Sequence, residues 1–213
     1  MDSSAVDELL CTTRSVRRRL DLDRPVPHQL LLDCIRISQQ APTGSDRQNW
    51  RWVLVTDEHL KVQIADLYRR GTRRVLVDRP LPEVVDDKGA RILRSSEHLV
   101  DNLHRVPVLA LPCIKGRLDT FDNFEAATFY GSIFPAVWSF MLAARARGLG
   151  TSLTTSHLHF EHEMAELLGI PSDVTQIAII PVAYYTGETF QLAQRSPPEW
   201  IASWNRWGNK TPG

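Results

Sequence analysis

Hydrophobic residues recur at intervals of three and four along several stretches of the chain, which is the spacing of one face of an α-helix. In the stretch from residue 28 to residue 40, for example, Leu31, Cys34 and Ile35 fall on one such face. From residue 134 onward, apolar or small side chains lie almost all round, which predicts a core helix with Pro135 in its first turn or at a kink. The pattern predicts helices over Ser4–Thr12, His28–Gln40, Glu58–Arg70, Phe134–Arg147 and Glu161–Leu168.

Short apolar runs between these helices predict four strands. They are Trp52–Val55, Val108–Ile114, the β-branched run that follows Gly148 and Gly150, and Ile177–Tyr185. Pro112 has no backbone N–H, so the second strand is expected at a sheet edge, at a bulge, or to end early. Strands and helices alternate without internal repeats, and a length of 213 residues favours one sizeable domain.

Three irregular segments are also predicted. Breaking residues in Ala41–Gly44 end the second helix, and the mixed charges of Pro80–Lys88 are typical of a loop that could act as a mobile lid. Two prolines and three tryptophans follow Arg195 without a clear period. Because tryptophan is costly to leave in water, we expect residues 196–213 to be an arm that packs on another surface, beyond a domain of residues 1–195.

Composition narrows the class of protein. Hydrophobic residues make up 43% and charged residues 23%, and no run of eighteen apolar residues occurs, which favours a globular protein over a membrane-spanning one. Lysine plus arginine equals aspartate plus glutamate at 25 each, so no global field draws the chain to nucleic acid or to a membrane. Any site for an anion must therefore be local.

The cysteines and the N-terminus bear on location. Cys11, Cys34 and Cys113 lie far apart, which fits neither a disulfide framework nor a zinc ribbon. The first ten residues carry three acidic side chains and lack both a basic start and an apolar core. We therefore expect no targeting peptide and a cytoplasmic protein.

A cluster of cations and hydroxyls follows the first predicted helix. It contains Thr13, Arg14, Ser15 and Arg17, followed by two more arginines. Guanidinium forks and hydroxyls suit a phosphate, whose oxygens accept several charge-assisted hydrogen bonds at once. The alternative is a solvated basic turn, and nucleic acid is a weaker candidate because no second basic stripe accompanies the cluster.

The basic cluster and the loop after the second helix together resemble two signatures of the nitroreductase family. Members of this family open with an RSxR segment, follow it about 25 residues later with a loop like PSxxNxQPW, and carry an arginine near a proline at the end. The counterparts in this chain are Arg14, Ser15, Arg17, Pro42, Thr43, Asp46, Gln48, Trp50 and Arg195. The stretch from Phe134 to Thr155 also resembles the family's dimer-core helix and flavin-edge strand, as in an actinobacterial type of nitroreductase.

The resemblance implies an α+β fold with a central, mainly antiparallel sheet flanked by helices, in an intertwined homodimer with FMN at each end of the subunit interface. It implies that Arg14, Ser15 and Arg17, beside Thr13, hold the phosphate and ribityl chain, that Arg17 reaches the N1 side of the ring, and that Arg195 closes on the phosphate. It further implies that Pro42, Thr43 and Gly44 line the ring, and that Thr154, Thr155 and Ser156 follow its N5 and O4 edge, largely through backbone donors.

Two residues depart from the family pattern. Asp46 stands where the family usually has asparagine, and Asn49 where it often has proline. A carboxylate near the ring would disfavour an anionic reduced flavin, so Asp46 is expected to face solvent or to pair with Arg47.

Two further clusters have competing interpretations. His157, His159 and His162 contain good metal ligands, but no distant histidine pair or carboxylate cluster completes a site, so we expect surface or pocket-rim histidines and no metal. The four arginines Arg69, Arg70, Arg73 and Arg74 suit a solvated helix end, and a weaker hypothesis gives them the 2′-phosphate of NADPH.

The function implied by the resemblance is electron transfer from NAD(P)H through FMN to a nitroaromatic, a quinone or a related small-molecule acceptor, by ping-pong turnover. Relatives of the same fold that dehalogenate, oxidise a biosynthetic intermediate or fragment flavin are alternatives. A flavin-binding or redox-sensing protein without enzymatic activity is the rival from a different class.

Overall fold

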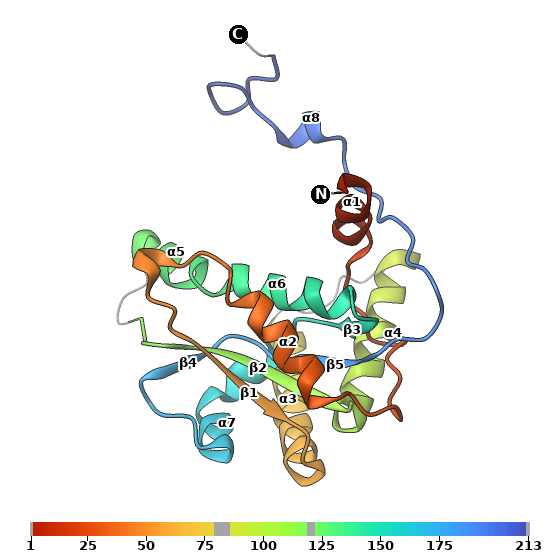
Figure 1. The fold of residues 1–213 in the computed structure, drawn as a ribbon, viewed down its shortest axis with the longest axis vertical. Helices are drawn as coiled ribbons and strands as arrows, with labels where there is room; N and C mark the ends of the chain where they lie inside the picture. Colours follow the sequence, from red (N-terminus) through yellow and green to blue (C-terminus); the bar gives the residue numbers. More distant parts are fainter. Residues whose placement is uncertain (1, 79–85, 119–121, 212–213) are drawn as a thin grey trace. The chain divides into compact units, whose positions relative to one another are not determined.

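The computed structural model describes residues 2–78, 86–118 and 122–211. The chain divides into two compact units, one formed by Arg14–Gly187 and the other by Met1–Thr13 together with Glu188–Gly213. The larger unit contains a five-stranded sheet in which every strand pairing is antiparallel. The predicted α+β architecture, a mainly antiparallel sheet flanked by helices, is therefore confirmed (Figure 1).

The sheet has the strand order β1-β2-β5-β3, and β4 pairs with the far end of β2. Its strands are β1 (Trp50–Val55), β2 (Val108–Lys115), β3 (Leu149–Thr151), β4 (Val174–Gln176) and β5 (Ile180–Tyr184). Strand β2 is central, because β1 pairs along one side of it while β4 and β5 share the other.

Pro112 lies inside β2 at a step in the register. Ala110 pairs with Ile180 of β5, whereas Cys113 pairs with Gln176 of β4. Between these two pairs, two residues of β2 (111–112) lie opposite the three residues that join β4 to β5 (177–179). The missing N–H of Pro112 falls at this bulge, and its carbonyl still accepts from Ile177 (3.0 Å). Of the three placements expected for Pro112, the structure has the bulge, in a central strand.

Both faces of β2 are covered, because seven of its eight residues are buried. Val108 and Ala110 point into a core shared with α2 (His28–Ser38) and α6 (Phe134–Arg145). Leu109 and Leu111, fully buried as well, alternate to the opposite face. Figure 1 shows α2 and α6 on one side of the sheet and α3 (Glu58–Asp78) with α7 (Glu161–Leu168) on the other.

Several predicted helices differ from the observed ones in length. Helix α3 runs to Asp78 rather than ending at Arg70, because Gly71 lies within the helix and does not terminate it. Helix α7 has the predicted bounds, and Gly169 ends it with a φ of 64°, a left-handed conformation that suits glycine. Helix α6 ends at Arg145, and Pro135 lies in its first turn as expected.

Two α-helices in the described part of the larger unit were not predicted. They are α4 (Asp87–Asn102), which Asp86 caps by accepting from the N–H of Gly89 (2.7 Å), and α5 (Asn123–Gly131), which Asp122 caps in the same way through Glu125 (2.7 Å). The predicted loop Pro80–Lys88 therefore extended too far, because its last two residues, Asp87 and Lys88, belong to α4. Residues 79–85 lie outside the described part of the chain.

The stretch Asn123–Arg145 is long and apolar enough to cross a membrane by length and composition alone. The structure divides it into α5 and α6 at Ser132 and Ile133, and six residues of α6 are buried in the protein core. A core helix of this composition passes the same test as a membrane span, so length and composition alone are weak evidence that this stretch crosses a membrane.

The smaller unit contains α1 (Ser3–Thr12), capped by Asp2, and α8 (Pro198–Ile201). Residues 188–197 have no regular secondary structure, and Pro198 is the first residue of α8. Trp200, Trp204 and Trp207 are 72%, 52% and 101% exposed. Their packing partner, expected from the sequence, therefore stays a prediction, as does the boundary expected at residue 195.

His157 lies in a 3₁₀ helix, η3 (Ser156–Phe160), that packs on α3. His157 is fully buried, and neither ring nitrogen has a hydrogen-bond partner among the described residues. Burial lowers the pKa of His157 to about 3, so the imidazole is neutral at physiological pH.

The buried imidazole predicts a specific loss of stability in acid. Because the folded pKa of His157 lies below the ordinary value of 6.5, the unfolded chain binds a proton that the folded chain excludes between these two values. The free energy of unfolding should therefore fall by about 1.4 kcal/mol per pH unit as the pH drops through this window. Denaturant titrations at several pH values measure this slope.

A His157→Leu variant should lack this contribution, whereas His162→Gln, which changes an exposed histidine on α7, should keep it. Equal slopes for the wild type and His157→Leu would show that His157 is protonated in the folded protein.

Candidate functional site

The basic segment of the larger unit runs along the edge of β3. Ser15 forms a parallel bridge with Thr151, and the N–H of Val16 donates to the Thr151 carbonyl (2.8 Å). Val16 is buried against Gly150, where a Cβ atom would lie 2.9 Å from Val16 Cγ1. The close approach at Gly150 therefore fixes the backbone that carries Arg14, Ser15 and Arg17.

Arg17 is half-buried and lies near Tyr68 of α3. No carboxylate forms an ion pair with Arg17 in the described part of the chain. Burial raises the pKa of the Tyr68 phenol, and the positive charge of Arg17 acts in the opposite direction. The phenol thus stays protonated at neutral pH beside a cation that is available to an anion.

Thr154, Thr155 and Ser156 follow β3 and lead into η3. The N–H of Thr154 donates to the Ile179 carbonyl (3.0 Å), and the Thr154 carbonyl accepts from Ile179 (2.8 Å). The backbone donor of Thr154 is therefore already used. Thr155 and Ser156 are left as the backbone donors that this segment could offer to a ligand.

Tyr68 joins this segment to Arg17. The side chains of Thr154, Ser156 and Thr72 lie close enough to its hydroxyl to lower its pKa, and the Thr72 hydroxyl donates to the Tyr68 backbone carbonyl (2.9 Å). Tyr68 was not among the predicted site residues, because helical spacing alone does not mark it as one. The structure brings it together with two parts of the predicted site, the arginine segment and the Thr154–Ser156 segment.

The loop after α2 is backbone-strained. Ser45, Asp46 and Gln48 have φ values of 54°, 51° and 49°, which side-chain-bearing residues rarely adopt. The N–H of Gly44 donates to Ser132 Oγ (3.0 Å), which holds the loop against the start of α6. Three such residues within four positions are typical of a loop with a constrained function.

Asp46, which departs from the family pattern, is exposed and accepts a hydrogen bond from Gln48 Nε2 (2.8 Å). Its exposure agrees with one of the two expectations for this carboxylate. The hydrogen bond comes from Gln48, however, and not from the neighbouring Arg47.

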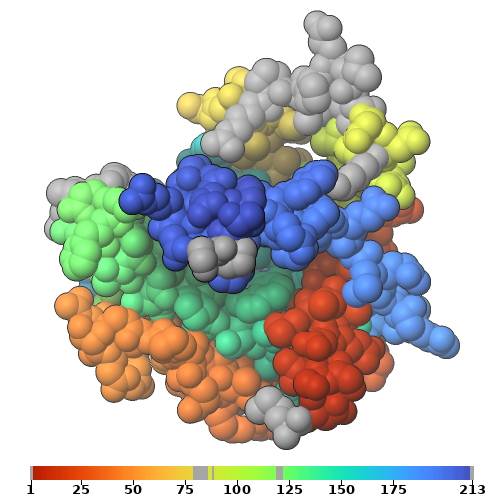
Figure 2. Space-filling model, turned by 90° about the horizontal axis from the view of Figure 1, so that it is seen from above, coloured from red at the N-terminus to blue at the C-terminus, as the bar shows by residue number. Residues whose placement is uncertain are grey.

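This loop lines a cavity of about 560 Å³ together with the end of β2 and with α5. Figure 2 shows α5 in green beside the orange residues of the loop. The cavity wall combines the aromatic side chains of Phe124 and Phe129 with polar and charged groups. Those charges belong to Arg47, Lys115, Arg117 and Glu125.

The cavity wall includes Thr43 and Gly44 but neither the arginine segment nor Thr154–Ser156. Thr151, which contacts the arginine segment, and Val108 at the start of β2 both pair with Val182 of β5. The loop, in contrast, leads into Trp50, which pairs with Ile114 near the end of β2. Six residues of a strand span about 20 Å. The loop and the arginine segment of the chain therefore lie at opposite ends of the sheet.

Arg195 and Thr13 belong to the smaller unit. Arg195 is exposed, and its guanidinium donates to the carbonyl of Gln194 (3.2 Å). The roles that the resemblance gives to these two residues stay predictions.

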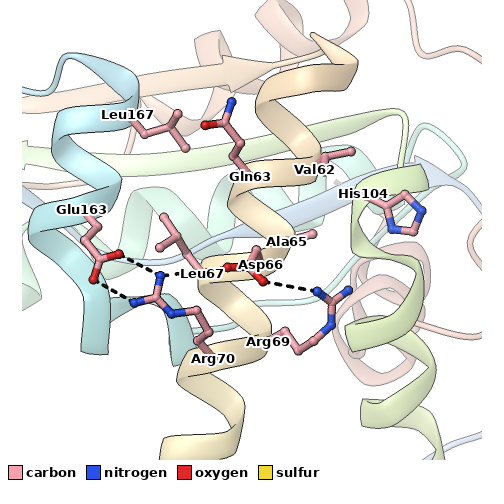
Figure 3. Close-up of a pocket in the computed structure, with 10 residues that line it drawn as sticks. All are labelled: Val62, Gln63, Ala65, Asp66, Leu67, Arg69, Arg70, His104, Glu163 and Leu167. Carbon is pink, nitrogen blue, oxygen red and sulfur yellow. Dashed lines mark hydrogen bonds and ion pairs between the residues drawn. The ribbon is translucent and has the colours of Figure 1, made fainter.

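A second cavity, of about 780 Å³, lies between α3 and α7 (Figure 3). Arg70 forms a two-point ion pair with Glu163 (2.8 and 3.0 Å), and Arg69 reaches Asp66 at 3.6 Å. These arginines line the middle of α3 rather than a helix end. Because Arg70 is engaged with α7, its charge is largely compensated, which weakens the hypothesis of a 2′-phosphate site.

His159 and His162 are exposed, as expected for surface residues, whereas His157 is a core residue. No group of three or more metal-ligating side chains occurs within the described ranges.

Comparisons with known proteins agree with this architecture. The nitroreductase family model matches residues 11–184. An iodotyrosine deiodinase from Thermotoga neapolitana is 28% identical over 82% of this chain and 86% of its own, and a putative NAD(P)H nitroreductase, YfhC, from Bacillus subtilis is 20% identical over 91% of each. The crystal structure of an oxidised iodotyrosine deiodinase bound to FMN and 3-iodo-L-tyrosine superimposes with a TM-score of 0.68 at 23% identity, over 89% of this chain and 94% of that one. The match over most of the chain, with the fold it predicts, shows that this protein belongs to the nitroreductase family.

Proposed function

We propose that the protein binds FMN and uses it to pass two electrons from NAD(P)H to an aromatic small-molecule acceptor. The observation that carries this proposal is the position of Arg17, an uncompensated cation held beside the Thr154–Ser156 segment through Tyr68. A cation and neutral donors on adjacent segments suit a ring that becomes negatively charged when it is reduced.

The residues present fit FMN better than a dinucleotide. Arg14, Ser15 and Arg17 offer guanidinium and hydroxyl donors from one ordered stretch, which suits a terminal phosphate. The sequence contains no GxGxxG fingerprint of the kind that binds a dinucleotide at a helix N-terminus. A dianionic phosphate would also compensate the charge of Arg17.

When bound, FMN supplies the redox chemistry, accepting a hydride from a nicotinamide and giving two electrons to a second molecule that takes the same place. The protein's share is to hold and polarise the ring. Arg17 would lie at the N1 side, and the N–H groups of Thr155 and Ser156 would donate at the N5 and O4 edge. Tyr68, protonated because burial raises its pKa, holds both segments in place.

A nitroaromatic or a quinone remains the leading acceptor class. The similarity to iodotyrosine deiodinases favours a second candidate, reductive removal of halogen from an aromatic ring. The cavity beside the Thr43–Asn49 loop accommodates either class, because Phe124 is 78% exposed and can stack on a flat ring.

We further propose that the site is completed in a homodimer. The loop that should line the ring lies about 20 Å along the sheet from the arginine segment of the same chain, so a second copy would have to supply it. A candidate interface exists on the layer of α2 and α6, which pack on each other. Four large apolar side chains are exposed there, namely Leu32, Ile37, Phe134 and Trp138.

Arg17 should dominate the retention of flavin. The purified protein should be yellow and release FMN, not FAD, on denaturation. Arg17→Ala should lower the FMN content severalfold and weaken binding by at least tenfold, because the charge-assisted hydrogen bonds of its guanidinium to FMN are lost. Chromatography of the released flavin and fluorescence titration of the apoprotein measure both quantities.

Arg18→Ala is the matched control, since Arg18 is exposed in the same segment and lies outside the RSxR pattern. Equal flavin occupancy in the two variants would contradict the assigned register. A colourless wild type that cannot be reconstituted with FMN would overturn the proposal itself.

The C-terminal arm should stabilise the dimer. Three exposed tryptophans that bury about 150 to 250 Å² each could anchor a substantial interface with the partner. A chain ending after Pro198 keeps Arg195 but loses these side chains, so its dimer should dissociate at higher protein concentration and its FMN affinity should fall. Light scattering over a dilution series, with flavin titration, tests this.

A chain ending after Thr211 keeps all three tryptophans and the hydrogen bonds of Lys210 to Trp200 and Ala202, and should behave as the wild type. An unchanged dimer, melting temperature and flavin affinity in the shorter chain would show that the arm does not hold the partner.

A further inference from the structure

Helix α3 approaches the Thr154–His157 segment more closely than any side chain would allow. A Cβ atom placed on Gly71 would lie 1.9 Å from the carbonyl oxygen of Ser156 and 3.3 Å from the backbone nitrogen of His157. Contacts below 3.0 Å to backbone atoms cannot be relieved by rotating a side chain, so the helix or the segment would have to move. Only glycine at position 71 permits this backbone-to-backbone packing.

Tyr68 lies one turn earlier on the same face of α3. It is 6% exposed, and the side chains of Thr154 and Ser156 lie close enough to its hydroxyl to lower its pKa. The Thr154 hydroxyl in turn donates to the Ile179 carbonyl (3.2 Å), which ties the arrangement to the sheet. Tyr68 thus holds the segment by polar contacts while Gly71 sets its distance from α3.

His157, the last residue of this segment, is buried in the protein core. Its ring makes no hydrogen bond within the described protein, so it contributes packing and does not act as an acid or a base. The position of the segment therefore depends on two residues of α3, the Tyr68 phenol and Gly71, which has no side chain.

We propose that Tyr68 and Gly71 are positioning residues that set the affinity and the reduction potential of the flavin by fixing the Thr154–His157 segment. This inference rests on the proposed function, in which that segment borders the N5 and O4 edge. Donors held at this edge stabilise the negative charge that reduction adds, and they stabilise it less when they are free to shift. Loosening the segment should therefore weaken the binding of reduced FMN more than that of oxidised FMN.

The decisive variant is Tyr68→Phe, which removes one hydroxyl and keeps the ring that fills the core. We expect a threefold to tenfold weaker binding of oxidised FMN, and a loss of affinity for reduced FMN that is up to tenfold larger. For a two-electron couple, a tenfold difference lowers the midpoint potential by about 30 mV. Fluorescence titration of the apoprotein and anaerobic redox titration against a reference dye measure the two effects.

Gly71→Ala should act in the same direction and more strongly, with at least a tenfold loss of FMN affinity, because backbone atoms must move apart. Gly131→Ala is its matched control, since a Cβ atom at that helical position meets nothing within 4 Å. We expect this control to leave both flavin properties unchanged. If Gly71→Ala does not fold, Tyr68→Phe decides alone.

Folded Tyr68→Phe with wild-type affinity and potential would overturn this inference, even if its melting temperature fell, because Tyr68 would then serve stability only. In that case a wild type that binds FMN and oxidises NAD(P)H with an acceptor would leave the proposed function standing. A wild type that binds no FMN would overturn both.

Discussion

Burial of strand β2 on both faces is the constraint on which the remaining elements depend. Because Val108 and Ala110 point to one layer of helices and Leu109 and Leu111 to the other, α6 and α3 must lie on opposite sides of the sheet. The register step at Pro112 lets two short strands share the free side of β2. It also brings Ile179 opposite Thr154, which starts the segment that borders the candidate site.

The site follows from this arrangement in two parts. On the α3 side, Tyr68 and the close approach at Gly71 hold the Thr154–Ser156 segment near Arg17, which leaves one cation without a carboxylate partner in the described structure. At the other end of the sheet, a strained loop and an aromatic wall form a separate cavity. The proposed dimer, in which the loop of one chain faces the arginine segment of the other, would bring these two halves together.

The sequence predicted features that depend on local spacing. The bounds of α7 follow from its apolar period and from Gly169, and the arginine segment and the strained loop were identified by their residue types. It did not predict α4 or α5, because a capping aspartate indicates a helix start only when a clear helical spacing of apolar residues follows it. Nor did it predict the buried state of His157, because a histidine next to a charged helix start resembles a surface residue.

The functional residues that were missed share one property. Tyr68 and Gly71 act through contacts with residues more than eighty positions away, and nothing local distinguishes them from other members of an amphipathic helix. Arg17, in contrast, was visible in the sequence because its neighbours form a motif. Long-range packing therefore supplied the part of the site that spacing could not.

The most direct test of the account is anaerobic mixing of the FMN-loaded protein with NADH or NADPH, followed by mixing with a nitroaromatic, a quinone or an iodotyrosine. The account predicts that a nicotinamide bleaches the flavin absorbance and that at least one of these acceptors restores it within the turnover time. Flavin that dithionite reduces, but that neither nicotinamide reduces, would contradict an NAD(P)H-linked enzyme and would indicate a protein that only binds flavin.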